Sequence, residues 1–149
     1  MKKPTPIEIL LVEDNPDDIR LTMEAFLDGK LLNNLNVALD GEDALFYLRK
    51  EGKHVNAIRP DLILLDLNLP KIDGKQFLEE IKKEENLRNI PVVILTTSKA
   101  EQDILKTYEL QANCYITKPV DLEQFMIVIR TISKFWLSIV KLPANTDKS

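Results

Sequence analysis

LILLDLNLPKIDG, residues 62–74, is the stretch that decides the fold of this chain. Its apolar run at 62–65 has no polar break, which is typical of a strand buried on both faces of a parallel sheet. Pro70 and Gly74 favour a loop, so the strand is predicted to end just after Asp66. Asp66 therefore stands at the carboxyl end of a central strand, where ligands gather in open α/β sheets. The alternative is that Asp66 only caps the turn before the next helix.

The rest of the chain repeats this alternation of strand and helix. Apolar runs predict four more strands, at 7–12, 35–39, 92–95 and 113–117. A helix-capping residue follows each of the five strands: Asn15, Asp40, Asp73, Ser98 and Asp121. This alternation is the signature of a doubly wound α/β domain with a five-stranded parallel sheet. Right-handed crossovers place the first, third and fourth strands side by side and the fifth next to them, the flavodoxin-like order 2-1-3-4-5.

Periodicity also predicts which side chains the helices bury. The first helix is expected to start at Pro16 and to end near Gly29. Helical spacing indicates that its buried stripe consists of Ile19, Met23, Phe26 and Leu27. The helix after the Asp73 cap is expected to turn inward Phe77, Leu78 and Ile81. The only histidine, His54, lies in a polar connection, so we interpret it as a solvated loop residue.

Composition bounds the class of protein. The chain has 149 residues, 44% hydrophobic and 30% charged, which fits one globular domain. A net charge of -4 and a pI near 5.1 argue against a nucleic-acid-binding surface. Cys114 is the only cysteine, so a disulfide within the chain is excluded and a cytoplasmic location is expected. No window approaches the roughly 20 apolar residues of a membrane span.

Polar side chains follow four of the five predicted strands, at the edge where carboxyl ends meet. They are Glu13 and Asp14, Asp66, Thr96, and Lys118. Each close pair of carboxylates costs on the order of 4 kcal/mol at an effective dielectric near 20, so the acids require a proton or a cation. An all-oxygen ligand set suits Mg²⁺. Lys118 and the Thr96 hydroxyl are suited to a phosphoryl oxygen, which leaves Asp66 as a nucleophile toward phosphorus.

Four motifs together carry a resemblance to a known family. VEDNP (12–16), LLDLNLPKIDG (64–74), ILTTS (94–98) and CYITKP (114–119), in this order and at strand ends, resemble the receiver domain of two-component response regulators. The resemblance extends from Ile7 to about Ile132, so we expect a single receiver domain over 1–149. Its core covers about 7–132, and a helix extension and tail cover 133–149.

The resemblance implies a role for each residue of the motifs. Asp66 is expected to be phosphorylated from the phosphohistidine of a sensor histidine kinase. Mg²⁺, or Mn²⁺, is expected to be bound by Asp14, Asp66 and the backbone carbonyl of Asn68, with Glu13 acting through water. Lys118 is expected to neutralise the phosphate, and Thr96 and Tyr115 to form the switch pair that turns inward on phosphorylation. The peptide bond before Pro119 is expected to be cis.

Three residues depart from the family pattern without removing a required group. Glu13 stands where Asp is more common, and Thr97 stands where a smaller residue is frequent, which narrows access to the site. Gln111 replaces a helix-ending Gly.

The last segment predicts an interface. FWLSIVKLP (135–143) covers too wide an arc of an extended final helix for one packed face. We expect Phe135, Trp136 and Ile139 to form a homodimer interface. The alternative is that the extension folds back onto its own domain. Three features together resemble the stand-alone regulators paired with phytochromes: this segment, DLNLPKIDG (66–74) and the long loop before the strand at 62–65. The resemblance makes a phytochrome the expected kinase and a non-phytochrome kinase the alternative.

Two other functions use the same sheet edge. A phosphohydrolase with an aspartyl intermediate needs a second acid to protonate the leaving group, and the sequence after Asp66 offers Leu67 and Asn68 instead. A flavodoxin-like carrier needs a Ser/Thr/Gly-rich phosphate loop after the first strand, where this chain has carboxylates. We therefore expect a phosphoacceptor signalling protein that catalyses only its own phosphotransfer and dephosphorylation.

Overall fold

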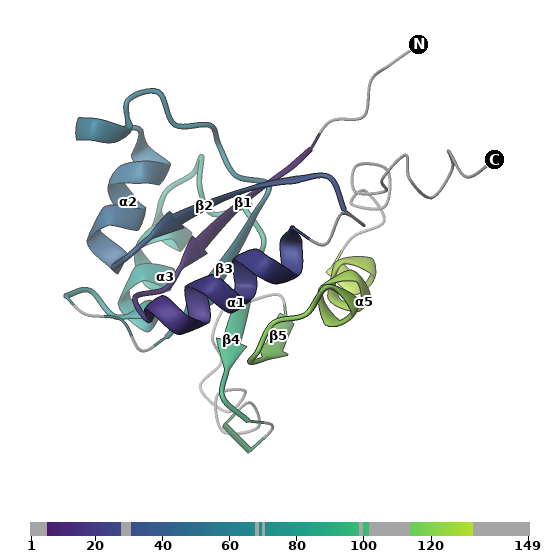
Figure 1. Cartoon of the computed structure of the whole chain (residues 1–149). Helices are drawn as coiled ribbons and strands as arrows, with labels where there is room; N and C mark the ends of the chain where they lie inside the picture. The colour runs from purple at the N-terminus through teal and green to yellow at the C-terminus, as the bar shows by residue number, and fades with distance from the viewer. Residues whose placement is uncertain are drawn as a thin grey trace, which may run out of the picture.

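The computed structural model describes residues 6–27, 31–67, 69, 71–98, 100–101 and 114–132 (Figure 1). The strands are β1 (Ile7–Val12), β2 (Asn33–Ala38), β3 (Leu62–Asp66), β4 (Val92–Thr96) and β5 (Cys114–Thr117). The helices are α1 (Pro16–Phe26), α2 (Gly41–Arg49), the 3₁₀ turn η1 (Gly52–His54), α3 (Gly74–Lys83) and α5 (Leu122–Ile132). None of the helices in these ranges is both long and apolar enough to cross a membrane.

The five strands form one parallel sheet in the order β2-β1-β3-β4-β5, which confirms the predicted fold class and strand order. The register brings the strand ends level at one edge. Val12 pairs with Leu65, and the last residue of β4, Thr96, pairs with Thr117 at the end of β5. Residues that follow the strands therefore start from the same edge of the sheet.

Helices cover both faces of the sheet, with α2 and α3 on one side and α1 and α5 on the other (Figure 1). The central strand β3 serves both cores, since Ile63 and Leu65 pack toward α2 and α3 while Leu62 and Leu64 pack toward α1 and α5. All four side chains are fully buried, which explains the unbroken apolar run. Burial of each stabilises the fold by roughly 1.5–3 kcal/mol.

The buried face of α1 differs from the predicted one. The helix starts at Pro16 as predicted, but it ends at Phe26 rather than near Gly29, which lies outside the described residues. Met23 is 41% exposed and Leu27 is 79% exposed, so their assignment to the core was wrong. Thr22 is buried in their place. Its hydroxyl donates to the backbone carbonyl of Asp18 at 2.8 Å, so this polar side chain enters the core with its hydrogen bond satisfied.

Two strands begin at other residues than predicted. The edge strand β2 starts at Asn33 rather than Leu35, because Asn33 pairs with Ile7 of β1 while its side-chain amide donates to the carbonyls of Phe26 and Leu31. β5 starts at Cys114, one residue later than predicted. An edge strand is stabilised by backbone pairing on one side only, so it needs no apolar pattern.

The other helical predictions agree with the structure where residues are described. The Phe77, Leu78 and Ile81 side chains of α3 are buried, and the peptide bond between Lys118 and Pro119 is cis. His54 is not simply solvated, since its Nε2 lies 2.8 Å from Asp43 Oδ1 and its ring packs edge-on against Tyr47. Ser98 caps the next helix by accepting from the backbone N–H of Glu101 at 3.1 Å. Gln111 lies outside the described residues.

Candidate functional site

Three carboxylates gather at the carboxyl edge of the sheet. Glu13 and Asp14 follow β1, and Asp66 is the last residue of β3. Each contributes one carboxylate oxygen to a group in which these oxygens lie within 4.8 Å of one another. The adjacency of β1 and β3 in the sheet brings the acids together, because residues that follow neighbouring parallel strands emerge side by side.

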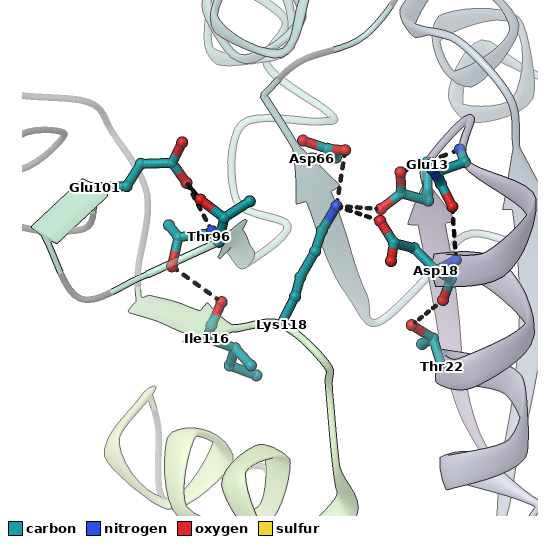
Figure 2. Close-up of polar contacts among 10 residues, drawn as sticks. Glu13, Asp18, Thr22, Asp66, Thr96, Glu101, Ile116 and Lys118 are labelled. Atoms are coloured by element: carbon teal, nitrogen blue, oxygen red, sulfur yellow. Dashed lines mark hydrogen bonds and ion pairs between the residues drawn. The ribbon is translucent and has the colours of Figure 1, made fainter.

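The ammonium of Lys118 lies among these acids (Figure 2). Its Nζ donates hydrogen bonds to Asp66 Oδ2 and Asp18 Oδ2, both at 3.0 Å, and lies 2.9 Å from Glu13 Oε1. The backbone N–H of Lys118 donates to the carbonyl of Thr96 at 2.7 Å, which ties this residue to the end of β4. Burial lowers the pKa of Lys118, but the three carboxylates outweigh burial, so the net pKa is raised and the side chain is an ammonium.

Glu13 is the most buried acid of the site, with 1% exposure. Its Oε2 accepts from the backbone N–H of Asn15 at 3.2 Å. Its Oε1 forms an ion pair with the Lys118 ammonium, but this buried oxygen accepts no hydrogen bond within the described part of the chain. Burial raises the pKa of Glu13 to about 7, with a further contribution from Asp66 that Lys118 opposes.

These features fit a divalent cation held by oxygen ligands. The Lys118 ammonium forms an ion pair with Glu13 Oε1 at 2.9 Å, but burial still raises the pKa of Glu13, so Lys118 does not fully compensate the charged carboxylate and a further cation would stabilise it. Glu13, Asp14 and Asp66 offer three hard oxygen ligands in one group, the donor set that Mg²⁺ or Mn²⁺ takes. The exposed Asp14 opens the group to solvent on one side.

Thr96 is fully buried, and its hydroxyl donates toward the carbonyl of Ile116 at 3.4 Å, as Figure 2 shows. The hydroxyl therefore turns toward β5. The next residue, Thr97, is exposed and is held by Glu101, whose carboxylate accepts from the Thr97 backbone N–H at 2.8 Å and lies 3.3 Å from its hydroxyl. Tyr115 is half-buried against the core beside α2 and α3, and burial raises its pKa.

Not every predicted residue falls within the described part of the chain. Asn68 and the three residues of the predicted dimer interface lie outside it: Phe135, Trp136 and Ile139. The sequence did not predict that Asp18 belongs to the site. The available signal was position, since Asp18 lies in the first turn of α1, the helix that follows the acids at the end of β1.

The fold and this edge define the class of protein: an α/β domain with three carboxylates and an ammonium at the carboxyl edge of a parallel sheet. Comparison with known proteins identifies the family. Residues 9–130 match the response regulator receiver domain. The response regulator Rcp1 of Synechocystis sp. is 46% identical over 139 residues, which cover 93% of this chain and 95% of Rcp1.

Solved structures agree with this match. The bacteriophytochrome response regulator AtBRR superposes with a TM-score of 0.80 at 45% identity, covering 87% of this chain and 94% of AtBRR. The phosphorylated cyanobacterial phytochrome response regulator RcpA gives 0.71 at 51% identity, covering 93% and 99%. The Mn²⁺-bound form of Rcp1 gives 0.70 at 47% identity, with the same coverage. This chain belongs to the family of response regulator receiver domains, and it is homologous to the phytochrome response regulators.

Proposed function

We propose that this chain is a phosphorylation switch in which Asp66 accepts a phosphoryl group from a sensor histidine kinase. One observation carries the proposal: the Asp66 carboxylate accepts from the Lys118 ammonium at 3.0 Å beside a group of acids suited to a divalent cation. A carboxylate oxygen of Asp66 attacks phosphorus, the bond between phosphorus and the kinase imidazole nitrogen breaks, and its electron pair stays on that nitrogen. Lys118 then faces the new negative charge.

A bound Mg²⁺ or Mn²⁺ would be held by Glu13, Asp14 and Asp66, and it would supply neutralisation of the transferring phosphoryl oxygens. The Mn²⁺-bound form of Rcp1 supports this ligand chemistry for a homologous site. The backbone carbonyl of Asn68 stays a predicted ligand. RcpA, a relative known in a phosphorylated form, supports phosphorylation of the receiver site itself.

Thr96 and Tyr115 form the proposed switch. The hydrogen bond from Thr96 to the carbonyl of Ile116 is long and joins neutral groups, whereas a phosphoryl oxygen on Asp66 would accept a charge-assisted bond. Phosphorylation therefore draws the Thr96 hydroxyl away from β5, and Tyr115 on that strand follows inward. The phosphoryl group adds about 1.5–2 negative charges, so the surface near β5 and α5 changes with it.

Homology to phytochrome regulators supports a phytochrome as the kinase, with a non-phytochrome kinase as the alternative. We also propose that the chain is one receiver domain that works in the cytoplasm and does not bind nucleic acid or membranes. In the same proposal, it forms a homodimer through Phe135, Trp136 and Ile139. Its catalysis is limited to its own phosphotransfer and dephosphorylation.

The test is incubation of the purified chain with a small acyl phosphate and Mg²⁺, followed by intact-mass measurement. We expect one phosphoryl group per chain, removed by hydroxylamine and prevented by a metal chelator. Asp66→Asn should abolish labelling, whereas the exposed control Asp17→Asn should label like the wild type. Equal labelling of the Asp66 variant would overturn the proposal.

A further inference from the structure

We propose that Asp18 is a positioning residue for phosphotransfer, which holds the Lys118 ammonium beside Asp66 while the other carboxylates of the site change partners. This inference rests on the proposed function. Asp18 is not among the acids of the cation group, and its contact with Lys118 gives it a separate role.

Two hydrogen bonds hold the backbone of Asp18 in place. Its N–H donates to the side chain of Asn15 at 2.9 Å, and its carbonyl accepts from the Thr22 hydroxyl at 2.8 Å. Its Oδ2 accepts from Lys118 Nζ at 3.0 Å, and Figure 2 shows it reaching the ammonium from α1, while Asp66 reaches it from β3. The position near the start of α1 also favours its negative charge. The short Asp18 side chain is therefore carried by a fixed backbone, whereas its partner Lys118 has a long and flexible side chain.

The other two carboxylates that contact Lys118 change their bonding during phosphotransfer. Asp66 uses a carboxylate oxygen for the new bond to phosphorus, and the hydrogen bond from Lys118 passes to the phosphoryl group. Glu13 forms an ion pair with Nζ at 2.9 Å and belongs to the proposed cation group. Among the described carboxylates around Lys118, Asp18 is thus the one whose chemistry stays the same throughout.

A fixed partner matters because a lysine side chain has four rotatable bonds. When Asp66 and Glu13 release it, an unanchored ammonium would sample several rotamers and face the phosphoryl group only part of the time. Asp18 prevents this by holding the ammonium in place before and after transfer, which is preorganisation of a charge that stabilises the transition state.

The experiment compares phosphorylation rates of four proteins: wild type, Asp18→Ala, Asp18→Glu and the control Asp17→Ala. Asp17→Ala is a matched control because it removes the same charge from the adjacent residue. The Asp17 side chain is 84% exposed and lies 4.0 Å from Arg20 rather than near Lys118. Loss of one charge-assisted hydrogen bond from the transition state predicts a labelling rate about tenfold lower in Asp18→Ala. Asp18→Glu should recover most of the rate, and Asp17→Ala should stay within about twofold of wild type.

A second readout does not depend on phosphorylation. In the unmodified protein, the ammonium protons of Lys118 should give a resolved NMR signal when Asp18 and Asp66 hold them, assigned by its absence in Lys118→Met. The signal should persist in Asp17→Ala and broaden into solvent exchange in Asp18→Ala. Far-UV circular dichroism confirms that each variant is folded.

The outcomes separate this inference from the proposed function. If wild type and Asp17→Ala take no phosphoryl group, the proposed function fails and the role of Asp18 falls with it. If both are labelled and Asp18→Ala is labelled as fast or faster, the positioning role alone is overturned. Faster labelling would mean that Asp18 acts instead as a negative charge that repels the phosphoryl donor.

Discussion

The burial of Glu13 predicts that the protein loses stability as the pH rises, in the absence of metal. The pKa of Glu13 is raised from 4.5 to about 7 in the folded chain. Between these two pH values the folded state keeps a proton on Glu13 that the unfolded chain has released. Stability therefore falls with rising pH in this window. A tenfold change in proton affinity is worth about 1.4 kcal/mol, so the total loss is about 3 kcal/mol between pH 4.5 and 7.

Urea unfolding followed by far-UV circular dichroism measures this effect, in buffers that contain a chelator, from pH 4.5 to 8. Other groups also titrate, so the quantity to read is the difference between wild type and Glu13→Gln, which keeps the side-chain shape without the charge. We expect the variant to gain about 3 kcal/mol relative to wild type from one end of this range to the other. Parallel curves for the two proteins would refute the reasoning.

Saturating Mg²⁺ adds a second arm to the same experiment. A cation that binds the ionised carboxylate competes with the proton, so wild type should lose most of its pH dependence and gain stability at pH 8. Glu13→Gln should respond less to Mg²⁺ at pH 8. An equal Mg²⁺ response in both proteins would show that Glu13 is not part of the cation group.

Three further predictions concern the frame of the site, each measured by urea unfolding at pH 8. Lys118→Met removes the ammonium that faces Glu13, Asp18 and Asp66, and it should lower the free energy of unfolding by about 2–3 kcal/mol. The loss should be smaller at pH 5, where Glu13 holds a proton. Gly74→Ala should lower the free energy of unfolding by about 3 kcal/mol, because the new Cβ would lie 2.4 Å from the Cα of Leu67, the residue after β3. Gly52→Ala should cost only about 1 kcal/mol, because open space surrounds Gly52 and the cost comes from its φ of +59° alone. Phe125→Ala should cost about 3–5 kcal/mol, since its ring is fully buried, and the 55% exposed Ile127→Ala should cost under about 0.5 kcal/mol.

The sequence predicted the layout of the sheet because the strongest signal, burial on both faces, is also the simplest. The run at 62–65 can satisfy that pattern only at the centre of a parallel sheet, and polar residues at the strand ends then meet at one edge. The prediction failed where a local hydrogen bond replaces an apolar side chain. Thr22 is buried because its hydroxyl bonds within α1, and Asn33 joins β2 through backbone and amide contacts that no apolar pattern marks.

The site shows the same division. The sequence predicted the site residues at the strand ends, because the carboxyl ends of all strands in a parallel sheet lie at the same edge. Asp18 was not found, because its role depends on the side chain of Lys118 reaching back across the edge from β5 to α1, a contact 100 residues apart in the sequence. A side-chain direction of this kind is set by packing and charge in three dimensions, beyond what helix capping or periodicity encodes.

The negative charge of the site explains why cation binding and phosphotransfer should be coupled. The three carboxylates of the cation group, those of Glu13, Asp14 and Asp66, carry a formal charge of −3 when all are ionised, and the Lys118 ammonium beside them is shared with Asp18. A phosphoryl donor approaching such a site is repelled, and Lys118 alone cannot offset three charges. A divalent cation reduces the formal charge to −1. Cation binding should therefore precede phosphotransfer, and the two affinities should be coupled in both directions.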